Sequence, residues 1–106
     1  MSAHYVVQWT PEAEFDAATI VDYFNDAINT EKVIVQFGKQ ANSLQRLPER
    51  GRVVPELRKF GVLHYRELIH KPWRMIYSIR GREVWIMAVV DGRRDLADLL
   101  FERLAR

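Results

Sequence analysis

The sequence predicts an α+β fold: an N-terminal strand, a helical hairpin, a three-stranded antiparallel meander and a short C-terminal helix. Apolar residues recur at helical spacing through residues 11–47, whereas they alternate at every second position in three runs between residues 62 and 90. Connections of two or three residues join these runs, and connections this short permit only antiparallel pairing. We expect one domain over residues 1–106, with elements in the order β-α-α-β-β-β-α and the hairpin packed on the sheet.

The chain begins with a predicted strand and a well-marked helix start. Residues 4–9 (HYVVQW) are rich in Val and aromatic residues and stop at Thr10-Pro11. Thr10 as N-cap, Pro11 in the first turn and two early glutamates predict a helix from this point. Its apolar stripe should continue to Ala27 or Ile28.

A second helix is expected directly after the first. Asn29-Thr30 interrupts the apolar pattern, and Thr30 can serve as the N-cap of the new helix, which Pro48 ends. A connection this short makes the two helices an antiparallel hairpin.

Residues 49–61 (ERGRVVPELRKFG) show no sustained period and are interpreted as a basic loop. Gly51, Pro55 and Gly61 interrupt it, with room for one turn around Pro55-Glu56-Leu57. Its four cations are Arg50, Arg52, Arg58 and Lys59.

The three alternating runs predict the meander. Tyr65, Glu67 and Ile69 share one face of the first strand, a pattern typical of a strand covered on one side. In the third strand the residues expected to share a face are Val84, Ile86, Ala88 and Val90. After the turn at Asp91-Gly92-Arg93-Arg94, the C-terminal helix carries the apolar residues Leu96, Leu99, Leu100 and Leu104.

Charge is distributed unevenly along the 106 residues. Residues 1–45 hold two basic and six acidic residues, whereas residues 46–106 hold fourteen basic and eight acidic residues. An arginine-rich half of this kind indicates an anionic partner, either nucleic acid or an acidic protein. For any single arginine, a solvated position paired with a nearby carboxylate remains the alternative.

Composition excludes several kinds of site. With no cysteine the chain has no disulfide and no thiolate nucleophile, and its three scattered histidines form no helical ligand pair. We therefore expect no metal and no cofactor. No run is long enough for a membrane helix and the N-terminus lacks a signal-peptide pattern, so a cytoplasmic protein is expected.

Few residues could move protons near the basic loop. A phosphodiester-cleaving site would need cations together with a general base and a general acid, and the candidates are Glu56, Glu67, His64 and Tyr65. Each has a structural alternative. Glu67 can pair with Arg74 across the strands, and the tyrosine can be a packing residue.

Four motifs now become informative together: PELRKF (Pro55–Phe60), YREL (Tyr65–Leu68), WRMIYSI (Trp73–Ile79) and VWIMAVVDGRRD (Val84–Asp95). With these motifs in this order, the chain resembles the RelE/ParE superfamily of toxins from bacterial type II toxin–antitoxin systems. The resemblance implies a small antiparallel sheet backed by a helical hairpin. It also implies a cognate antitoxin that wraps around the toxin.

Two activities are implied by the resemblance. Ribosome-dependent ribonucleases of this kind combine a loop glutamate and a strand arginine, matched by Glu56 and Arg74 and supported by Arg58 and Lys59, with a His-Tyr pair or a tyrosine after the last strand. Asp91-Gly92-Arg93-Arg94 holds that third place without imidazole or phenol. The loss of such a group should cost about 100- to 10,000-fold in rate. This departure favours the ParE-like branch, whose members inhibit DNA gyrase.

The expected partners are therefore an antitoxin and DNA gyrase, with the ribosome and mRNA as the alternative targets. The cations expected to face the target are Arg50, Arg52, Arg58, Lys59, Arg66, Arg74, Arg93 and Arg94. The apolar residues expected to meet the antitoxin are Phe24, Ile28, Phe37, Trp73, Trp85, Leu96 and Leu100.

Overall fold

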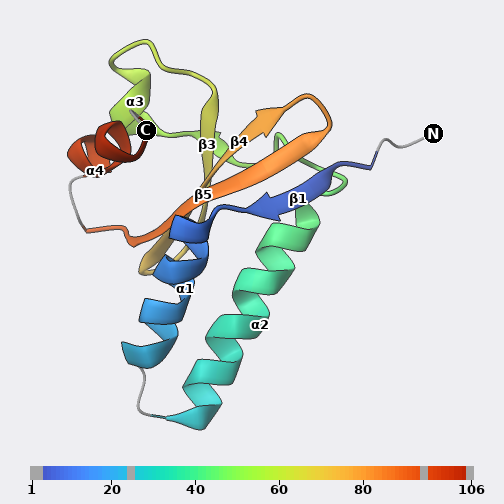
Figure 1. The fold of residues 1–106 in the computed structure, drawn as a ribbon, viewed down its shortest axis with the longest axis vertical. Coiled ribbons are helices and arrows are strands. Elements are labelled where there is room, and N and C mark those ends of the chain that lie inside the picture. Colours follow the sequence, from blue (N-terminus) through green and yellow to red (C-terminus); the bar gives the residue numbers. More distant parts are fainter. Residues whose placement is uncertain (1–3, 24–25, 94–95, 105–106) are drawn as a thin grey trace.

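The computed structural model describes residues 4–23, 26–93 and 96–104 and has the predicted α+β class. Figure 1 shows its elements in chain order. They are β1 (Val6–Trp9), α1 (Pro11–Tyr23), α2 (Ala27–Ser43), β2 (Arg52–Val53), α3 (Pro55–Arg58), β3 (Tyr65–His70), β4 (Trp73–Arg80), β5 (Glu83–Asp91) and α4 (Leu96–Leu104).

The strands form a single sheet in the order β1-β5-β4-β3-β2. The meander β3–β4–β5 is antiparallel, as the short connections predict. Strand β1 returns to the edge of the sheet and runs parallel to β5. The other edge is formed by the two-residue strand β2, which pairs with β3.

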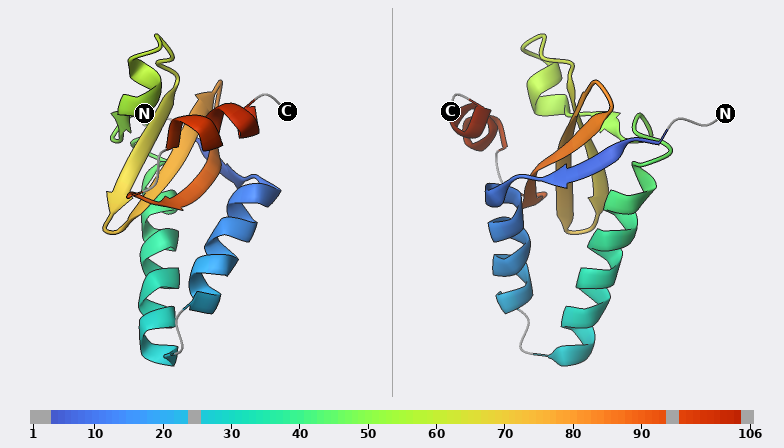
Figure 2. Two further views of the ribbon diagram at one scale, coloured as in Figure 1. Left: turned by 90° about the vertical axis from the view of Figure 1, so that its left-hand side faces the viewer. Right: turned by 45° about the vertical axis from the view of Figure 1, so that its right-hand side comes forward.

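Helices cover both faces of the sheet, so the prediction of a single covered face is wrong. The α1–α2 hairpin packs on a core that includes Phe37, Met75 and Tyr77. On the opposite face a second core includes Leu57, Ile76 and Leu100, below α3 and α4. Figures 1 and 2 show α3 and α4 beside each other, away from the hairpin.

A β-bulge explains how β5 serves both cores. The register shifts between Ile76 and Tyr77 of β4, because Ile76 pairs with Ala88 while Tyr77 pairs with Ile86. Met87 is the extra residue, and an extra residue reverses the face on which later side chains lie. Val84 and Ile86 therefore face the hairpin, whereas Ala88 and Val90 face α3 and α4. The expectation that all four share a face is wrong.

The first helix begins as predicted, and the hairpin connection differs from the prediction. The Thr10 hydroxyl accepts a hydrogen bond from the amide of Ala13 at 3.1 Å, which confirms the cap. Helix α1 ends at Tyr23, and α2 already begins at Ala27. The N-cap of α2 is Asp26, whose Oδ1 accepts from the amide of Ile28 at 2.9 Å, so the assignment of the cap to Thr30 is wrong.

The basic loop holds more order than the sequence indicates. Helix α2 ends at Ser43, before the predicted stop at Pro48. The segment that follows forms β2 and then α3, which is the turn expected around Pro55-Glu56-Leu57. Leu57 is fully buried and anchors α3 on the sheet.

Candidate functional site

Four charged side chains form a chain across β2, β3, β4 and α3. The Nε of Arg74 donates to Oε1 of Glu67 at 2.5 Å, and its Nη1 and Nη2 donate to the two carboxylate oxygens of Glu56 at 2.6 and 2.8 Å. The Nε of Arg52 donates to Oε2 of Glu67 at 2.6 Å. The side chain of Glu67 is 0% exposed and that of Arg74 is 8% exposed. The cluster is therefore a set of two cations and two anions in which Glu67 and Arg74 are buried, Glu56 is partly buried and Arg52 is exposed.

Strand register and one helical turn bring the four groups together. Arg52 lies opposite Glu67, and Arg74 lies opposite Ile69, so Glu67 and Arg74 are diagonal neighbours on one face of the sheet. The cross-strand pairing of Glu67 with Arg74 is thus confirmed. Glu56 reaches the cluster because Pro55 starts α3 directly above it.

These contacts decide what Glu56 and Arg74 can do chemically. Hydrogen bonds from Arg74 lower the pKa of Glu56, and the bonds to Glu56 raise the pKa of Arg74 further above its already high value. Glu56 therefore remains a carboxylate and is poorly suited to donate a proton near neutral pH. Arg74 can bind a phosphate strongly only by giving up one of its two carboxylate partners.

A shallow basic hollow of about 350 Å³ lies beside this cluster, at the turn between β3 and β4. Its lining includes Arg52, Lys71, Arg74 and Arg93. Gly92 closes the hollow where a side chain would be crowded, because a Cβ there would lie 3.1 Å from the carbonyl oxygen of Pro72 and 3.2 Å from Cδ of Arg74. The Asp91 carboxylate holds Arg93 through three hydrogen bonds of 2.7 to 3.0 Å.

The candidate proton carriers His64 and Tyr65 lie far along the sheet from Arg74. Tyr65 pairs with Ser78, four positions from Arg74 on β4, which corresponds to about 13 Å along the strand. Tyr65 is buried in the second core, and the exposed His64 ring stacks on it at 4.3 Å between centroids. The structure therefore does not bring these rings to Glu56 and Arg74.

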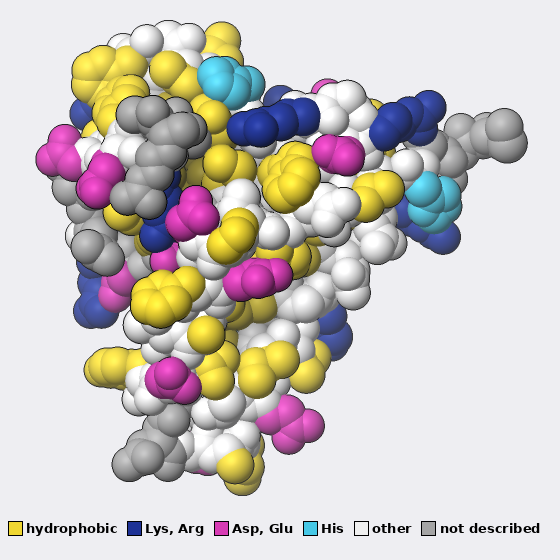
Figure 3. All heavy atoms as spheres, viewed as in Figure 1, with side chains coloured by type: hydrophobic (Ala, Val, Ile, Leu, Met, Phe, Trp, Pro, Cys, Tyr) yellow, Lys and Arg dark blue, Asp and Glu magenta, His cyan; other side chains and the backbone are white. Residues whose placement is uncertain are grey.

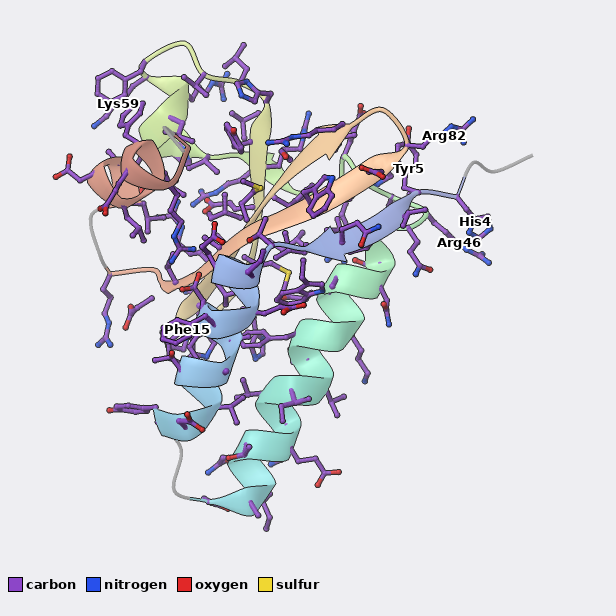
Figure 4. All side chains as sticks on the ribbon, in the orientation of Figure 1. His4, Tyr5, Phe15, Arg46, Lys59 and Arg82 are labelled. Carbon is purple, nitrogen blue, oxygen red and sulfur yellow. The ribbon has the colours of Figure 1, made fainter. Side chains whose placement is uncertain are left out.

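Exposed side chains on α3, on the segment that follows it and on α4 form a mixed cationic and aromatic surface, which we call the α3–α4 patch. It consists of Arg58, Lys59, Phe60, Leu63 and Phe101. The rings of Phe60 and Phe101 meet edge to face with centroids 5.5 Å apart, and Nζ of Lys59 lies 5.5 Å from the Phe60 centroid. Figure 4 labels Lys59 at this end of the molecule. Arg58 and Lys59 were predicted from the sequence, whereas the three apolar members were not.

The apolar residues expected to meet an antitoxin are only partly on the surface. Ile28 is 65% exposed on α2, and Trp73 and Trp85 are half-buried. In contrast, Phe37, Leu96 and Leu100 are buried in the two cores. Their periodic spacing indicated a packed face, which the chain itself covers. Phe24, and Arg94 among the cations, lie outside the described residues.

A second, more apolar hollow of about 620 Å³ lies between α1, α4 and the ends of β4 and β5, and we call it the α1 hollow. Phe15 and Tyr23 line it from α1 and are 73% and 82% exposed. Figure 4 shows Phe15 projecting from this helix. Sequence reasoning did not select these two residues, although both are aromatic residues off the buried stripe of α1.

An ion pair closes one side of the α1 hollow. Nη1 and Nη2 of Arg103 donate to the two carboxylate oxygens of Asp16 at 2.6 and 2.8 Å. Arg103 also donates to the carbonyl of Met87, while Asp16 accepts from the amide of Val89, so the pair satisfies the backbone of the bulge. Helix α4 is thereby tied to α1 and β5.

Within residues 4–23, 26–93 and 96–104, no group of three or more His, Asp or Glu side chains could hold a metal ion. No helix in the same ranges is long and apolar enough to cross a membrane.

Comparisons with known proteins agree with this architecture. A family model described as the ParE toxin of the type II toxin–antitoxin system parDE matches residues 7–96. Similar solved structures include a chromosomal ParDE system from P. aeruginosa, with 22% identity, a TM-score of 0.62 and coverage of 83% of this chain and 96% of the other. The RelBE2 toxin–antitoxin complex of Mycobacterium tuberculosis shows 20% identity, a TM-score of 0.60 and coverage of 84% and 92%. No curated protein matches the chain significantly.

Proposed function

Because this chain belongs to the ParE toxin family of type II toxin–antitoxin systems, we propose that it inhibits DNA gyrase when no antitoxin is bound. The observation that carries the proposal is the pairing of Glu56 with Arg74. The two residues that match the ribonuclease pattern are bound to each other by two short hydrogen bonds, and Arg74 is also bound to Glu67. A role in binding a protein target requires no proton transfer from these groups.

The α3–α4 patch is the surface that we assign to the target. Exposed aromatic residues beside cations are the composition that protein interfaces favour at their energetic centre. Arg58 and Lys59 project there from α3. Arg52, Arg74 and Arg93 are already neutralised by carboxylates, so we expect them to contribute less. Gyrase as the target would place the activity in the cytoplasm.

The α1 hollow is the surface that we assign to the antitoxin. Phe15 and Tyr23 expose large aromatic side chains beside it, and Trp73 and Leu99 add apolar lining. An amphipathic antitoxin helix could bury these side chains, in the mode in which helices dock into apolar grooves. Ile28 on the neighbouring end of the hairpin would extend the contact.

A supercoiling assay with purified gyrase tests the proposal. The wild-type chain should block supercoiling and leave cleaved plasmid, whereas Phe60→Ala should weaken inhibition at least tenfold, because hot-spot aromatic residues often contribute about 2 kcal/mol or more. Ile34→Ala, which removes a similarly exposed apolar side chain from α2, is the matched control. Full gyrase activity in the presence of wild-type chain would refute the proposal.

The alternative is an endoribonuclease that cleaves mRNA on the ribosome, and the basic hollow beside Arg74 favours it. A translation extract distinguishes the two activities. Codon-linked cuts that Arg74→Lys abolishes would support the ribonuclease, whereas intact transcripts together with gyrase-dependent DNA cleavage would support the gyrase inhibitor.

A further inference from the structure

Five arginines gather at the end of the sheet opposite the β3–β4 turn, where the N-terminal strand begins. We call this surface the arginine edge. Arg80 and Arg82 flank the β4–β5 turn, Arg66 lies near this end of β3, and Arg46 and Arg50 lie in the segment between α2 and β2. We propose that the arginine edge binds the phosphate backbone of duplex DNA directly. This activity goes beyond the proposed function and can be measured without gyrase.

Backbone contacts bring the segments of the arginine edge together. The amide of Tyr5 donates to the carbonyl of Gln45 at 2.8 Å, and the amide of Val6 donates to the carbonyl of Arg82 at 2.9 Å. The guanidinium of Arg82 lies 5.9 Å from the ring centroid of Tyr5. Figure 4 shows Arg46, Arg82, Tyr5 and His4 side by side at this end, and in Figure 3 dark blue side chains gather at the same edge.

The arginines of this edge keep their charge free, unlike four arginines elsewhere in the fold. Arg52, Arg74, Arg93 and Arg103 each form an ion pair with a carboxylate. Within the described ranges of the chain, no member of the arginine edge does so. This difference leaves a local excess of positive charge in a protein whose net charge is only +2.

Two members are oriented by neutral acceptors. Nη1 of Arg66 donates to the carbonyls of Gly51 at 2.7 Å and Glu49 at 3.3 Å, and Nη1 of Arg50 donates to the hydroxyl of Ser43. Bonds to carbonyl and hydroxyl groups hold a guanidinium in place without neutralising it. The remaining N–H groups can then form the paired hydrogen bonds that phosphate oxygens accept.

Two glutamates lie near the edge and reduce its charge without pairing with it. Glu83 accepts a hydrogen bond from Nε1 of Trp85 at 2.9 Å, and the printed contact of Glu49 uses its backbone carbonyl. Counting both carboxylates against the five arginines, the edge keeps three positive charges. That excess suits a polyanion with regularly spaced charges.

The surroundings favour DNA over an acidic protein. A protein partner would need apolar side chains to bury around the cations. Among the described residues, the exposed large apolar side chains near this edge are Val6 and Leu47, 53% and 63% exposed, whereas aromatic residues are exposed on α1 and on the α3–α4 patch. Contacts to phosphates, in contrast, need only positive charge and hydrogen-bond donors.

Fluorescence anisotropy with a labelled duplex of random sequence tests the proposal on chain made by cell-free synthesis. The logarithm of the binding constant should fall with the logarithm of salt concentration with a slope of about −3 to −4.5, as expected for three to five phosphate contacts. The double variant Arg46→Ala/Arg82→Ala should bind at least tenfold more weakly and lose about two units of slope. Both residues are exposed, which makes this variant safer for folding than Arg66.

Lys32→Ala/Lys39→Ala is the matched control, because it also removes two exposed positive charges, both from α2. It should leave affinity and slope within about a factor of two. An equal loss in Lys32→Ala/Lys39→Ala would mean that net charge alone explains the effect, and it would overturn the proposal. So would absence of duplex binding at low salt, or tighter binding of a labelled acidic peptide than of the duplex under the same conditions.

Discussion

Arg74 shows how a buried cation can be tolerated at the scale of a single residue. Removing an ion from water costs several kcal/mol, and only close, well-oriented partners offset that cost. Arg74 has three hydrogen bonds to two carboxylates, and Glu67 has a second arginine on its other oxygen. Arg74 is therefore important for stability because its removal would leave the carboxylates of Glu67 and Glu56 without this partner.

We predict that Arg74→Met lowers the free energy of unfolding by about 3–5 kcal/mol, because Glu67 would keep its charge in the core with one partner instead of two. Arg93→Met is the matched control. It removes an ion pair whose arginine side chain is 82% exposed, and solvent screening of that pair should make the loss far smaller than that of Arg74→Met. Urea denaturation of both variants gives the comparison, and equal losses would contradict it.

The stability supplied by Glu56 should depend on pH. The bonds from Arg74 lower the folded-state pKa of Glu56 below its unfolded value of about 4.5. Its contribution is therefore fully present above that value and is lost as pH falls through the folded-state pKa. Wild type should exceed Glu56→Gln in unfolding free energy at pH 7, and the gap should narrow below about pH 4.5. A gap that is constant from pH 7 to pH 3 would rule out this linkage.

At the scale of elements, the sequence predicts those whose signals are local. The cap of α1 at Thr10, the three strands and the apolar residues of α4 all follow from spacing and turn chemistry. The bulge at Met87 could not be predicted, because residues 84–90 (VWIMAVV) are apolar at every position and a shift in register leaves no trace in such a run. The sequence does not predict β2, because a strand of two residues shows no periodic pattern and forms only by pairing with β3.

The candidate site likewise contains one contact that the sequence predicts and one that it does not. Glu67 and Arg74 lie on neighbouring strands, so strand alternation suffices to predict their pairing. Glu56 joins them only because α3 folds over the sheet, which is a tertiary contact that no local pattern indicates.

The N-cap of α2 provides a test at the same scale. Asp26→Ala should cost about 1 kcal/mol, because the amide of Ile28 and the side-chain amide of Asn29 lose their acceptor. Thr30→Ala should change stability by less than about 0.5 kcal/mol, since Thr30 lies inside the helix. Thermal unfolding of the two variants distinguishes the caps, and a larger loss for Thr30→Ala would restore the assignment made from the sequence.

At the scale of the whole molecule, one sheet separates two cores, and paired and unpaired arginines lie at different places along it. Toward the β3–β4 turn and α4, Arg74 and Arg103 are paired with carboxylates and tie elements together. At the arginine edge they form no such pairs within the described residues. The uneven charge noted in the sequence thus serves two purposes, since part of it stabilises the fold and the rest faces solvent.

The ion pair between Asp16 and Arg103 should control how firmly α4 is held on the molecule. Arg103→Ala would remove the guanidinium that donates to the Met87 carbonyl and the Asp16 carboxylate. The free energy of unfolding should fall by about 1–3 kcal/mol.

Asp16→Asn should lower the free energy of unfolding less than Asp16→Ala does, because the amide oxygen of asparagine can still accept from the Val89 amide.

Hydrogen exchange measures directly how firmly α4 is held. In Arg103→Ala the amides of α4 should exchange faster, while those in the middle of α2 change only as much as global stability requires. Because α4 carries Phe101 of the α3–α4 patch, the same variant should weaken gyrase inhibition even where the chain remains folded. Unchanged protection of α4 would show that Leu96 and Leu100 alone hold the helix.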